Sequence, residues 1–421
     1  MGFFGKLFGM ESSSTPAAVA APAARPAPAS SASSVFSSSH SAPAKGGNWF
    51  NGAGKKNTVP QQRTVYSRKG APLPLKASDV RSSGGEGTVY TMPGKDRILI
   101  KIYHDSIVGD PRKMAELRAR IDDMIGYDLS SNLCLAWPRL AALDAPQGKM
   151  IGFAMNRCEG RSFYSLGGGP AAVRQAFPGW DRLQLAKTAL DFVSKVEQLA
   201  KHGIFINDFN PNNFLVNEKC EVSFIDCDSF QVPRRNGGAP HITRTFFGAY
   251  TAPELLRDPS LLARPRDIHQ VEFGAAMIVF HLLMCGLHPY SYCDQNSPNA
   301  CGSPEENLRK GRCPLGIGTN CRLPYGPNNL WYNLWSWLTG ELKGCFIRTF
   351  RDGHGDPGCR ASLGELKAAL AQLVFEMNRP ADQDALGYAP SRRALTPRQA
   401  KPRGDKNSDT AARVPGKAFR R

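Results

Sequence analysis

The stretch Asn-Asp-Phe-Asn-Pro-Asn-Asn-Phe-Leu-Val at residues 207–216, followed by Phe-Ile-Asp-Cys-Asp-Ser-Phe at residues 224–230, decides how this chain is interpreted. Asp208 is followed by Asn213 five residues later and by Asp226 eighteen residues later. Both stretches combine strand-like apolar runs with polar loop residues. Carboxylate and amide oxygens on such loops suit Mg²⁺, which keeps several waters and is bound largely through nucleotide phosphates. The spacing therefore predicts a site that handles a metal ion and phosphate.

A glycine-rich turn lies upstream of these loops. Gly84, Gly85 and Gly87 fall between two strand-like runs, and Val89 follows two residues later. Glycines allow backbone amides to approach phosphate groups closely, because no Cβ intervenes. Gly84 and Gly87 fit the second and third positions of Gly-x-Gly-x-x-Gly, but Ser82 stands at the first. On its own this incomplete motif would favour an ordinary glycine-rich hairpin.

Lys101 lies in a β-rich run after this turn. Side chains alternate between the faces of a strand, so Lys101 points away from Ile100 and Ile102, towards a polar cleft. It needs an acidic partner to stay oriented. Glu116, fifteen residues later on the helix expected from residue 110, is the candidate; the alternative for Glu116 is a solvated helix charge.

The composition divides the chain into three parts. Residues 1–75 are rich in Ser, Ala, Pro and Gly, and residues 379–421 are rich in Pro, Arg, Lys and Ala. Both segments are predicted to be disordered tails. Residues 76–378 begin with β-rich runs and continue with helical patterns, which predicts a two-lobed α+β fold. We place the β-rich N-lobe at residues 76–158 and the helical C-lobe at residues 159–378.

Charge and cysteine content bear on partners and compartment. The net charge is +17, with eight Lys and Arg against one Glu in residues 1–75, and eleven against four acidic residues in residues 379–421. The basicity lies mainly in the tails, where like charges are usually solvated, so no specific nucleic-acid binding is predicted. No secretory signal or membrane-spanning run is recognisable. The eleven Cys then indicate reduced thiols in the cytoplasm.

The chain resembles a bacterial Ser/Thr protein kinase over residues 76–378. Downstream of the two loops, Gly-Ala-Tyr-Thr-Ala-Pro-Glu at residues 248–254 is similar to the end of a kinase activation segment. Asp-Pro-Gly-Cys-Arg-Ala-Ser at residues 356–362 is similar to the late kinase element whose Arg pairs with that Glu. The resemblance implies a protein kinase-like fold and an ion pair between Glu254 and Arg360.

The same resemblance implies the chemistry of the site. ATP and Mg²⁺ would be the cofactors, and the γ-phosphate would pass to a Ser or Thr hydroxyl of a protein substrate. Asp208, Lys101 and Glu116 would be the catalytic residues, and Asn213 and Asp226 the metal ligands. The nucleotide contacts implied are Gly84, Gly85, Gly87, Val89, Lys101, Asn156 and Cys158.

Three sequence motifs indicate a particular subgroup of these kinases: Asn-Asp-Phe-Asn-Pro-Asn-Asn, Ile-Asp-Cys-Asp-Ser-Phe-Gln and Leu-Leu-Met-x-Gly-x-His-Pro-Tyr. They are similar to a divergent bacterial kinase subgroup that is associated with a von Willebrand factor A protein and a metal-dependent phosphatase. That subgroup belongs to stress-response systems of the tellurium-resistance type. The resemblance implies these two proteins as partners and stress signalling as the setting.

Several positions depart from the kinase pattern. Asn207 stands where most kinases have an Arg, Asn210 where they have a Lys, and Cys227-Asp228 where they have Phe-Gly. Asp228 has two interpretations, as an extra metal ligand or as a turn cap. The losses favour weak activity, so the alternative function is a nucleotide-binding pseudokinase scaffold.

Asn207 also affects regulation. Without the Arg, a phosphate on the activation segment would lack its guanidinium partner. We therefore expect activity without phosphorylation there, and little loss of rate in Thr243→Ala or Thr245→Ala.

Overall fold

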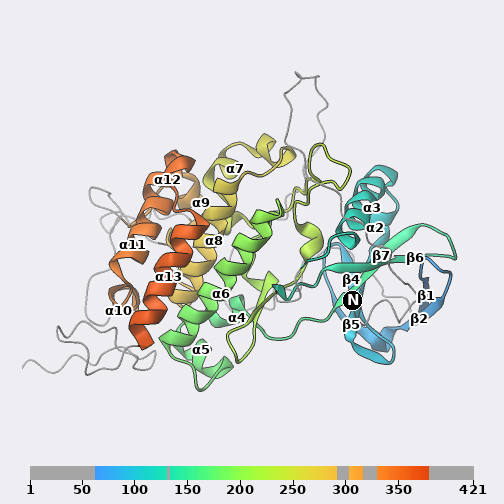
Figure 1. The fold of residues 1–421 in the computed structure, drawn as a ribbon, viewed down its shortest axis with the longest axis horizontal. Helices are drawn as coiled ribbons and strands as arrows, with labels where there is room; N and C mark the ends of the chain where they lie inside the picture. The colour runs from blue at the N-terminus through green and yellow to red at the C-terminus, as the bar shows by residue number, and fades with distance from the viewer. Residues whose placement is uncertain (1–61, 130–132, 292–302, 316–329, 379–421) are drawn as a thin grey trace, which may run out of the picture.

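The computed structural model describes residues 62–129, 133–291, 303–315 and 330–378. They form a sheet-rich lobe, on the right in Figure 1, and a helical lobe on the left. None of the helices in these ranges has the length and apolar character that crossing a membrane requires. The two-lobed α+β fold predicted from the sequence is confirmed.

The described part of the first lobe is built on a seven-stranded antiparallel sheet in the order β2-β1-β6-β7-β5-β4-β3. Its strands are β1 (Gln62–Tyr66), β2 (Pro72–Lys76), β3 (Val80–Ser83), β4 (Gly87–Met92), β5 (Lys95–Tyr103), β6 (Pro138–Leu143) and β7 (Met150–Asn156).

Two helices follow β5: α2 (Asp105–Val108) and α3 (Pro111–Ile125). Asp110 starts α3, because its carboxylate accepts hydrogen bonds from the amides of Arg112 and Lys113. α3 packs against β6.

The two faces of β5 serve different purposes. Ile98, Ile100 and Ile102 are buried in an outer core together with residues of β1 and β2. Lys101 and Tyr103 alternate with them and are also buried, but on the other face. The strand thus positions Lys101 towards the helical lobe, as its alternation with isoleucine predicts.

The helical lobe packs around two long helices. α6 (Arg182–Lys201) contacts α8 and α13, and α8 is buried over nearly its whole length. A small antiparallel sheet in the order β10-β9-β8 lies at the junction with the first lobe. Its strands are β8 (Arg161–Ser162), β9 (Phe214–Val216) and β10 (Val222–Phe224). The other helices are α4 (Phe163–Leu166), α5 (Pro170–Ala176), α7 (Pro253–Arg257), α8 (Ile268–Leu283), α9 (Pro304–Arg309), α10 (Leu330–Ser336), α11 (Gly340–Ile347), α12 (Gly353–Gly355) and α13 (Leu363–Asn378).

The folded region begins earlier in the chain than the sequence predicts. Residues 62–76, within or next to the predicted N-terminal tail, form β1 and β2, and their side chains Val65 and Leu75 are buried against β4 and β5. β2 was not predicted because it contains Pro-Leu-Pro-Leu, and proline is uncommon inside strands. The rest of that tail and residues 379–421 lie outside the described residues. The division of the lobes near residue 158, between β7 and β8, stays a proposal.

Candidate active site

Lys101 is the centre of a buried ion cluster. Its Nζ lies 2.7 Å from Asp226 Oδ1, 2.8 Å from Asp228 Oδ2 and 2.9 Å from Asp228 Oδ1. Glu86 Oε2, from the glycine-rich turn, lies 4.0 Å away. Burial alone would lower the pKa of Lys101, but the charges of Asp228, Asp226 and Glu86 hold it above its ordinary value. Lys101 is therefore a permanent cation at this position.

Asp228 is the main partner of Lys101. It is 2% exposed, and besides the two bonds from Lys101 it accepts a hydrogen bond of 2.7 Å from the Tyr103 hydroxyl. Burial raises the pKa of Asp228, but the charge of Lys101 and the hydrogen bonds from Lys101 and Tyr103 outweigh burial and lower it below its usual range. Asp228 is thus a fully bonded carboxylate that orients Lys101. Among the described residues Asp228 makes no capping hydrogen bond, and its role as an extra metal ligand stays a prediction.

The expected ion pair between Lys101 and Glu116 is not formed within the described ranges. Glu116 is exposed on α3, whereas Leu117, Ile121 and Met124 of that helix are buried. Packing of these three apolar side chains sets the rotation of α3 and leaves Glu116 on its outer side. The prediction that Glu116 holds Lys101 is wrong, and Asp228 has that contact instead.

Arg120, one turn after Glu116, is a residue that the sequence interpretation missed. It is half-buried, and its Nε is buried without a hydrogen-bond partner among the described residues. Its charge acts on Asp228 and on Glu86, so it lies near the acidic side of the cluster. α3 therefore brings a cation towards the site where a carboxylate was expected. A periodicity count could have found it, since Arg120 lies beside the buried positions of the helix.

Asp208 has a different environment from Asp228. Its Oδ2 accepts a hydrogen bond of 3.3 Å from the Asn213 amide, while its Oδ1 is buried without a partner among the described residues. Burial, and then the negative charge of Asp226, raise the pKa of Asp208 to about 6. A buried carboxylate oxygen without a partner is uncommon and is available to accept a hydrogen bond from a ligand.

The loop of residues 207–213, which the sequence predicts to be catalytic and which is called the catalytic loop below, is shaped by local contacts. Asn210 Oδ1 accepts a hydrogen bond of 3.0 Å from the Asn212 amide and caps the short 3₁₀ turn Pro211–Asn213. Asn210 therefore acts as a cap at the position where kinases present a lysine. The proline at the start of the turn fixes the backbone for it.

A backbone hydrogen bond beside Asp226 ties its segment to Asn213. The Ile225 amide donates a 2.9 Å hydrogen bond to the Asn213 carbonyl. Asp226 has φ 56° and ψ 37°, a left-handed conformation that Asp tolerates better than most residues. The Asn213 side-chain nitrogen is used by Asp208, so its side-chain oxygen is the atom left for a cation.

The donor set fits a weakly held hard cation. Among the described residues, no cluster of three or more His, Cys, Asp and Glu side chains is arranged to enclose a metal. An ion next to Asp226 and Asn213 would thus complete its coordination with water and phosphate oxygens, which is the habit of Mg²⁺.

The glycine-rich turn is closed by a hydrogen bond of 2.9 Å from the Gly84 amide to the Gly87 carbonyl. A Cβ on Gly87 would lie 2.5 Å from the Ile102 carbonyl oxygen, so no other residue fits there. Gly84 and Gly85 are exposed, with open space around them. Val89 pairs with Lys101 across β4 and β5. The turn thus lies directly beside the ion cluster.

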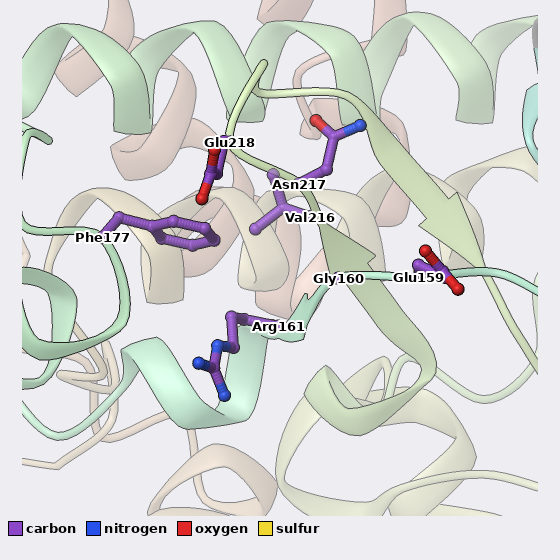
Figure 2. A pocket seen from close by; sticks show the side chains of 7 residues that line it. All are labelled: Glu159, Gly160, Arg161, Phe177, Val216, Asn217 and Glu218. Atoms are coloured by element: carbon purple, nitrogen blue, oxygen red, sulfur yellow. The ribbon is translucent and has the colours of Figure 1, made fainter.

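The segment that joins the lobes carries the last two predicted contacts. Asn156 ends β7 and is exposed, and the half-buried Cys158 directs its thiol to the Cys134 carbonyl at 3.6 Å. The next residues line a cavity of about 310 Å³ with Phe177 and the turn after β9. Figure 2 shows Phe177 and Val216 at its centre, with polar side chains around them. Lys101, Asp208 and Asp226 do not line this cavity, so it is separate from the ion cluster.

The ion pair implied for the end of the activation segment is confirmed. Arg360 is bidentate to Glu254, with Nη1–Oε1 and Nη2–Oε2 distances of 2.9 and 2.7 Å. Arg360 also donates to the carbonyls of Gly353 and His269. Burial raises the pKa of Glu254, but Arg360 outweighs this and lowers it. The pair anchors the end of the segment, residues 226–254, to the helical lobe.

No family model matches the chain. Over 214 residues the chain is 33% identical to the protein kinase YegI of Escherichia coli K12, and equally to that of Escherichia coli O157:H7. The match covers 49% of this chain and 31% of either relative, so the chain spans about a third of the length of the curated relatives it matches. This similarity supports a relationship to bacterial protein kinases.

Among solved structures, the chain is similar to a structure described as the ROP18 kinase domain in complex with AMP-PNP and sucrose. The TM-score is 0.46 and the sequence identity 14%, over 74% of this chain and 83% of that one. No residue correspondence follows from similarity at this level.

Proposed function

We propose that the chain is an ATP- and Mg²⁺-dependent protein kinase that transfers the γ-phosphate to Ser or Thr hydroxyls of a protein substrate. The observation that carries the proposal is the convergence of four residues, Lys101, Asp208, Asn213 and Asp226, from three separate segments of the chain. Lys101 from β5 lies 2.7 Å from Asp226, and Asp226 follows the strand that is bonded to the loop of Asp208 and Asn213. A protein that only packed these loops would need no such set.

Each residue has a chemical role in this proposal. Bound ATP with Mg²⁺ supplies the transferable phosphoryl group. Asp208, through its Oδ1, accepts the hydrogen bond of the substrate hydroxyl and takes its proton. Lys101, held by Asp228, would neutralise phosphate charge, and Asp226 with Asn213 would hold the cation.

The remaining nucleotide contacts are proposed on position. Gly84, Gly85 and Gly87 offer backbone amides to phosphate, and Val89 lies across from Lys101. Asn156 and Cys158, in the segment that joins the lobes, would meet the base.

A pseudokinase scaffold is the second candidate. The observation that favours it is Asn210, which caps a turn and offers no positive charge to a departing phosphate. The scaffold would bind nucleotide without transferring it.

A phosphotransfer assay with labelled ATP and Mg²⁺ separates the two. Wild type is compared with Asp208→Ala and with the control Asp258→Ala, an exposed capping residue. Nucleotide binding is measured on each by calorimetry. A kinase transfers label in wild type and in the control but not in Asp208→Ala. Binding without transfer in all three supports the scaffold, and no binding by wild type refutes both candidates.

The cellular setting rests on the sequence resemblance alone. It comprises a cytoplasmic location, stress signalling, and a metal-dependent phosphatase and a von Willebrand factor A protein as partners. Direct binding of the two purified partners to the full chain, measured by calorimetry, checks the partner proposal.

A further inference from the structure

Thr243 lies in the middle of the activation segment, residues 226–254, and is 5% exposed. Just before Thr243 the segment folds back on itself, where the His241 amide donates a 2.8 Å hydrogen bond to the Val232 carbonyl. Phe205 and Gln231 pair in the same region through 3.0 and 2.9 Å backbone bonds. Thr243 is thus carried into the protein next to the loop that holds Asp208.

Every hydrogen-bonding function of the Thr243 hydroxyl is used. The hydroxyl donates to the carbonyl of Ser229 and accepts from the side-chain amide of Asn207. It also accepts from the Thr245 hydroxyl at 3.4 Å, and the Asn207 amide makes a second bond of 3.3 Å to the Thr243 carbonyl. One donor and two lone pairs are all that a hydroxyl offers.

The two groups that Thr243 joins lie at the ends of the two loops of the site. Asn207 is the residue before Asp208, and Ser229 is the residue after Asp228. Ser229 is also bonded to Asp226, because its amide and hydroxyl both donate to the Asp226 carbonyl. One side chain therefore connects the segment that carries Asp226 and Asp228 to Asn207, the residue before Asp208.

We infer that Thr243 is a positioning residue, whose unmodified hydroxyl sets the distance between Asp208 and the segment of Asp226 and Asp228. The inference rests on the proposed kinase function and adds to it how the site is kept assembled. A phosphate on Thr243 would remove the only proton that the hydroxyl donates. It would also bring negative charge into a buried position whose neighbour is the neutral Asn207, so the unmodified form is the competent one.

The contacts of the Thr243 hydroxyl oppose one expectation from the sequence. The sequence predicts that Thr243→Ala lowers the rate only slightly, because Asn207 replaces the arginine that would bind a phosphate on Thr243. The contacts agree that phosphate has no partner there, but they give the hydroxyl itself a function. Other contacts hold the segment in place: His241 Nε2 lies 2.7 Å from Asp123 Oδ2 on α3, and the Tyr127 hydroxyl donates to the Pro233 carbonyl at 3.1 Å. Loss of the Thr243 hydroxyl should therefore loosen the site without unfolding the segment.

The test compares Thr243→Val, Thr243→Ser and Thr251→Val in the full chain. Valine removes the hydroxyl at nearly constant shape, and serine restores it. Thr251 is a matched control, since it is 6% exposed and its hydroxyl donates to the Phe247 carbonyl within the same turn, at 2.8 Å. For Thr243→Val we expect kcat to fall by about tenfold, the factor that one lost buried hydrogen bond represents, with KM for ATP within about twofold. Thr243→Ser and Thr251→Val should stay within about threefold of wild-type kcat.

Hydrogen–deuterium exchange gives a second measure that does not depend on activity. Thr243→Val should exchange faster than wild type at both residues 207–213 and residues 226–230, and Thr251→Val at neither. Unchanged exchange at both loops, or an unchanged kcat in Thr243→Val, overturns the inference, as does a serine variant as slow as valine. Mass spectrometry that finds phosphate on Thr243 in the active protein also overturns it. A wild type without phosphotransfer refutes the proposed function instead, and the exchange result then decides the inference alone.

Discussion

The two loops of the site hold their aspartates in opposite ways. Asp228, on the segment after β10, is buried and fully bonded, and its pKa is lowered. Asp208, on the catalytic loop, has one bonded oxygen and one buried oxygen without a partner among the described residues, and its pKa is raised. A saturated carboxylate holds its neighbours in place, whereas an under-bonded one is ready to accept a proton. In the proposed kinase, Asp228 would orient Lys101 and Asp208 would take part in the chemistry.

Asp208→Asn should produce the largest effect if this division is right. The amide cannot take the proton of the substrate hydroxyl, so kcat should fall by about a thousandfold. The melting temperature should not fall, because the change removes a buried carboxylate that lacks a full set of partners. Steady-state phosphotransfer and thermal unfolding measure both quantities. Retained activity would move the base elsewhere.

Asp228→Asn should come next, with a different signature. Lys101 would lose its main buried partner, and the reduced orientation should lower kcat/KM for ATP by about a hundredfold. The unfolding free energy should fall by about 3 kcal/mol, since one member of a buried ion pair is neutralised. Denaturant titration measures this loss.

Glu116→Gln is the control for that variant, because Glu116 is the exposed acid first expected to hold Lys101. It should change neither kcat/KM nor stability by a measurable amount. A Glu116→Gln variant as impaired as Asp228→Asn would show that α3 rotates inward during turnover.

The pH dependence should separate the two aspartates. Asp208 must be deprotonated to accept a proton, and its pKa is raised to about 6, so kcat/KM should rise about tenfold per pH unit below 6 and level off above it. Asp228, whose pKa is lowered, is ionised throughout this range. An activity profile that is flat from pH 5 to pH 8 would contradict the assignment of Asp208.

The smallest expected effect concerns Arg120. Its charge acts on the Asp228 side of the site, so Arg120→Gln should raise KM for ATP by about fivefold while kcat changes little. Arg118→Gln is the matched control, because Arg118 lies on the exposed side of the same helix and pairs with Asp122 at 3.7 Å. Equal KM values for ATP in the two variants would show that Arg120 does not contribute to ATP binding.

The parts of the site that depend on short-range spacing could be predicted from the sequence. Asp208 and Asn213 lie five residues apart across a proline turn, which fixes their relation whatever packs around them. The direction of Lys101 follows from its alternation with Ile100 and Ile102 on one strand. Local geometry decides both.

The partner of Lys101 could not be predicted in the same way. Glu116 was the acid predicted to hold it, and whether Glu116 can reach Lys101 depends on how α3 is rotated by its buried side chains. A signal was nevertheless present, because Asp228 lies two residues after Asp226, and Tyr103 lies two residues after Lys101 on the same strand face. When a partner for a strand lysine is predicted, acids two residues from the metal-binding aspartate should be considered before an acid on a more distant helix. Proline-rich strands such as β2 are missed for another reason, since their composition is that of a loop.

The hairpin of β1 and β2 has a consequence for recombinant work. Tyr66 of β1 pairs with Leu143 of β6, and the Arg68 guanidinium binds Asp122 of α3, so the hairpin covers one side of β6. A truncated protein that begins at residue 76 would leave that backbone open to pairing with another molecule, and the apolar side chains beneath it would meet solvent. Such a fragment should self-associate into insoluble material. A fragment that begins at or before residue 61 should stay in solution.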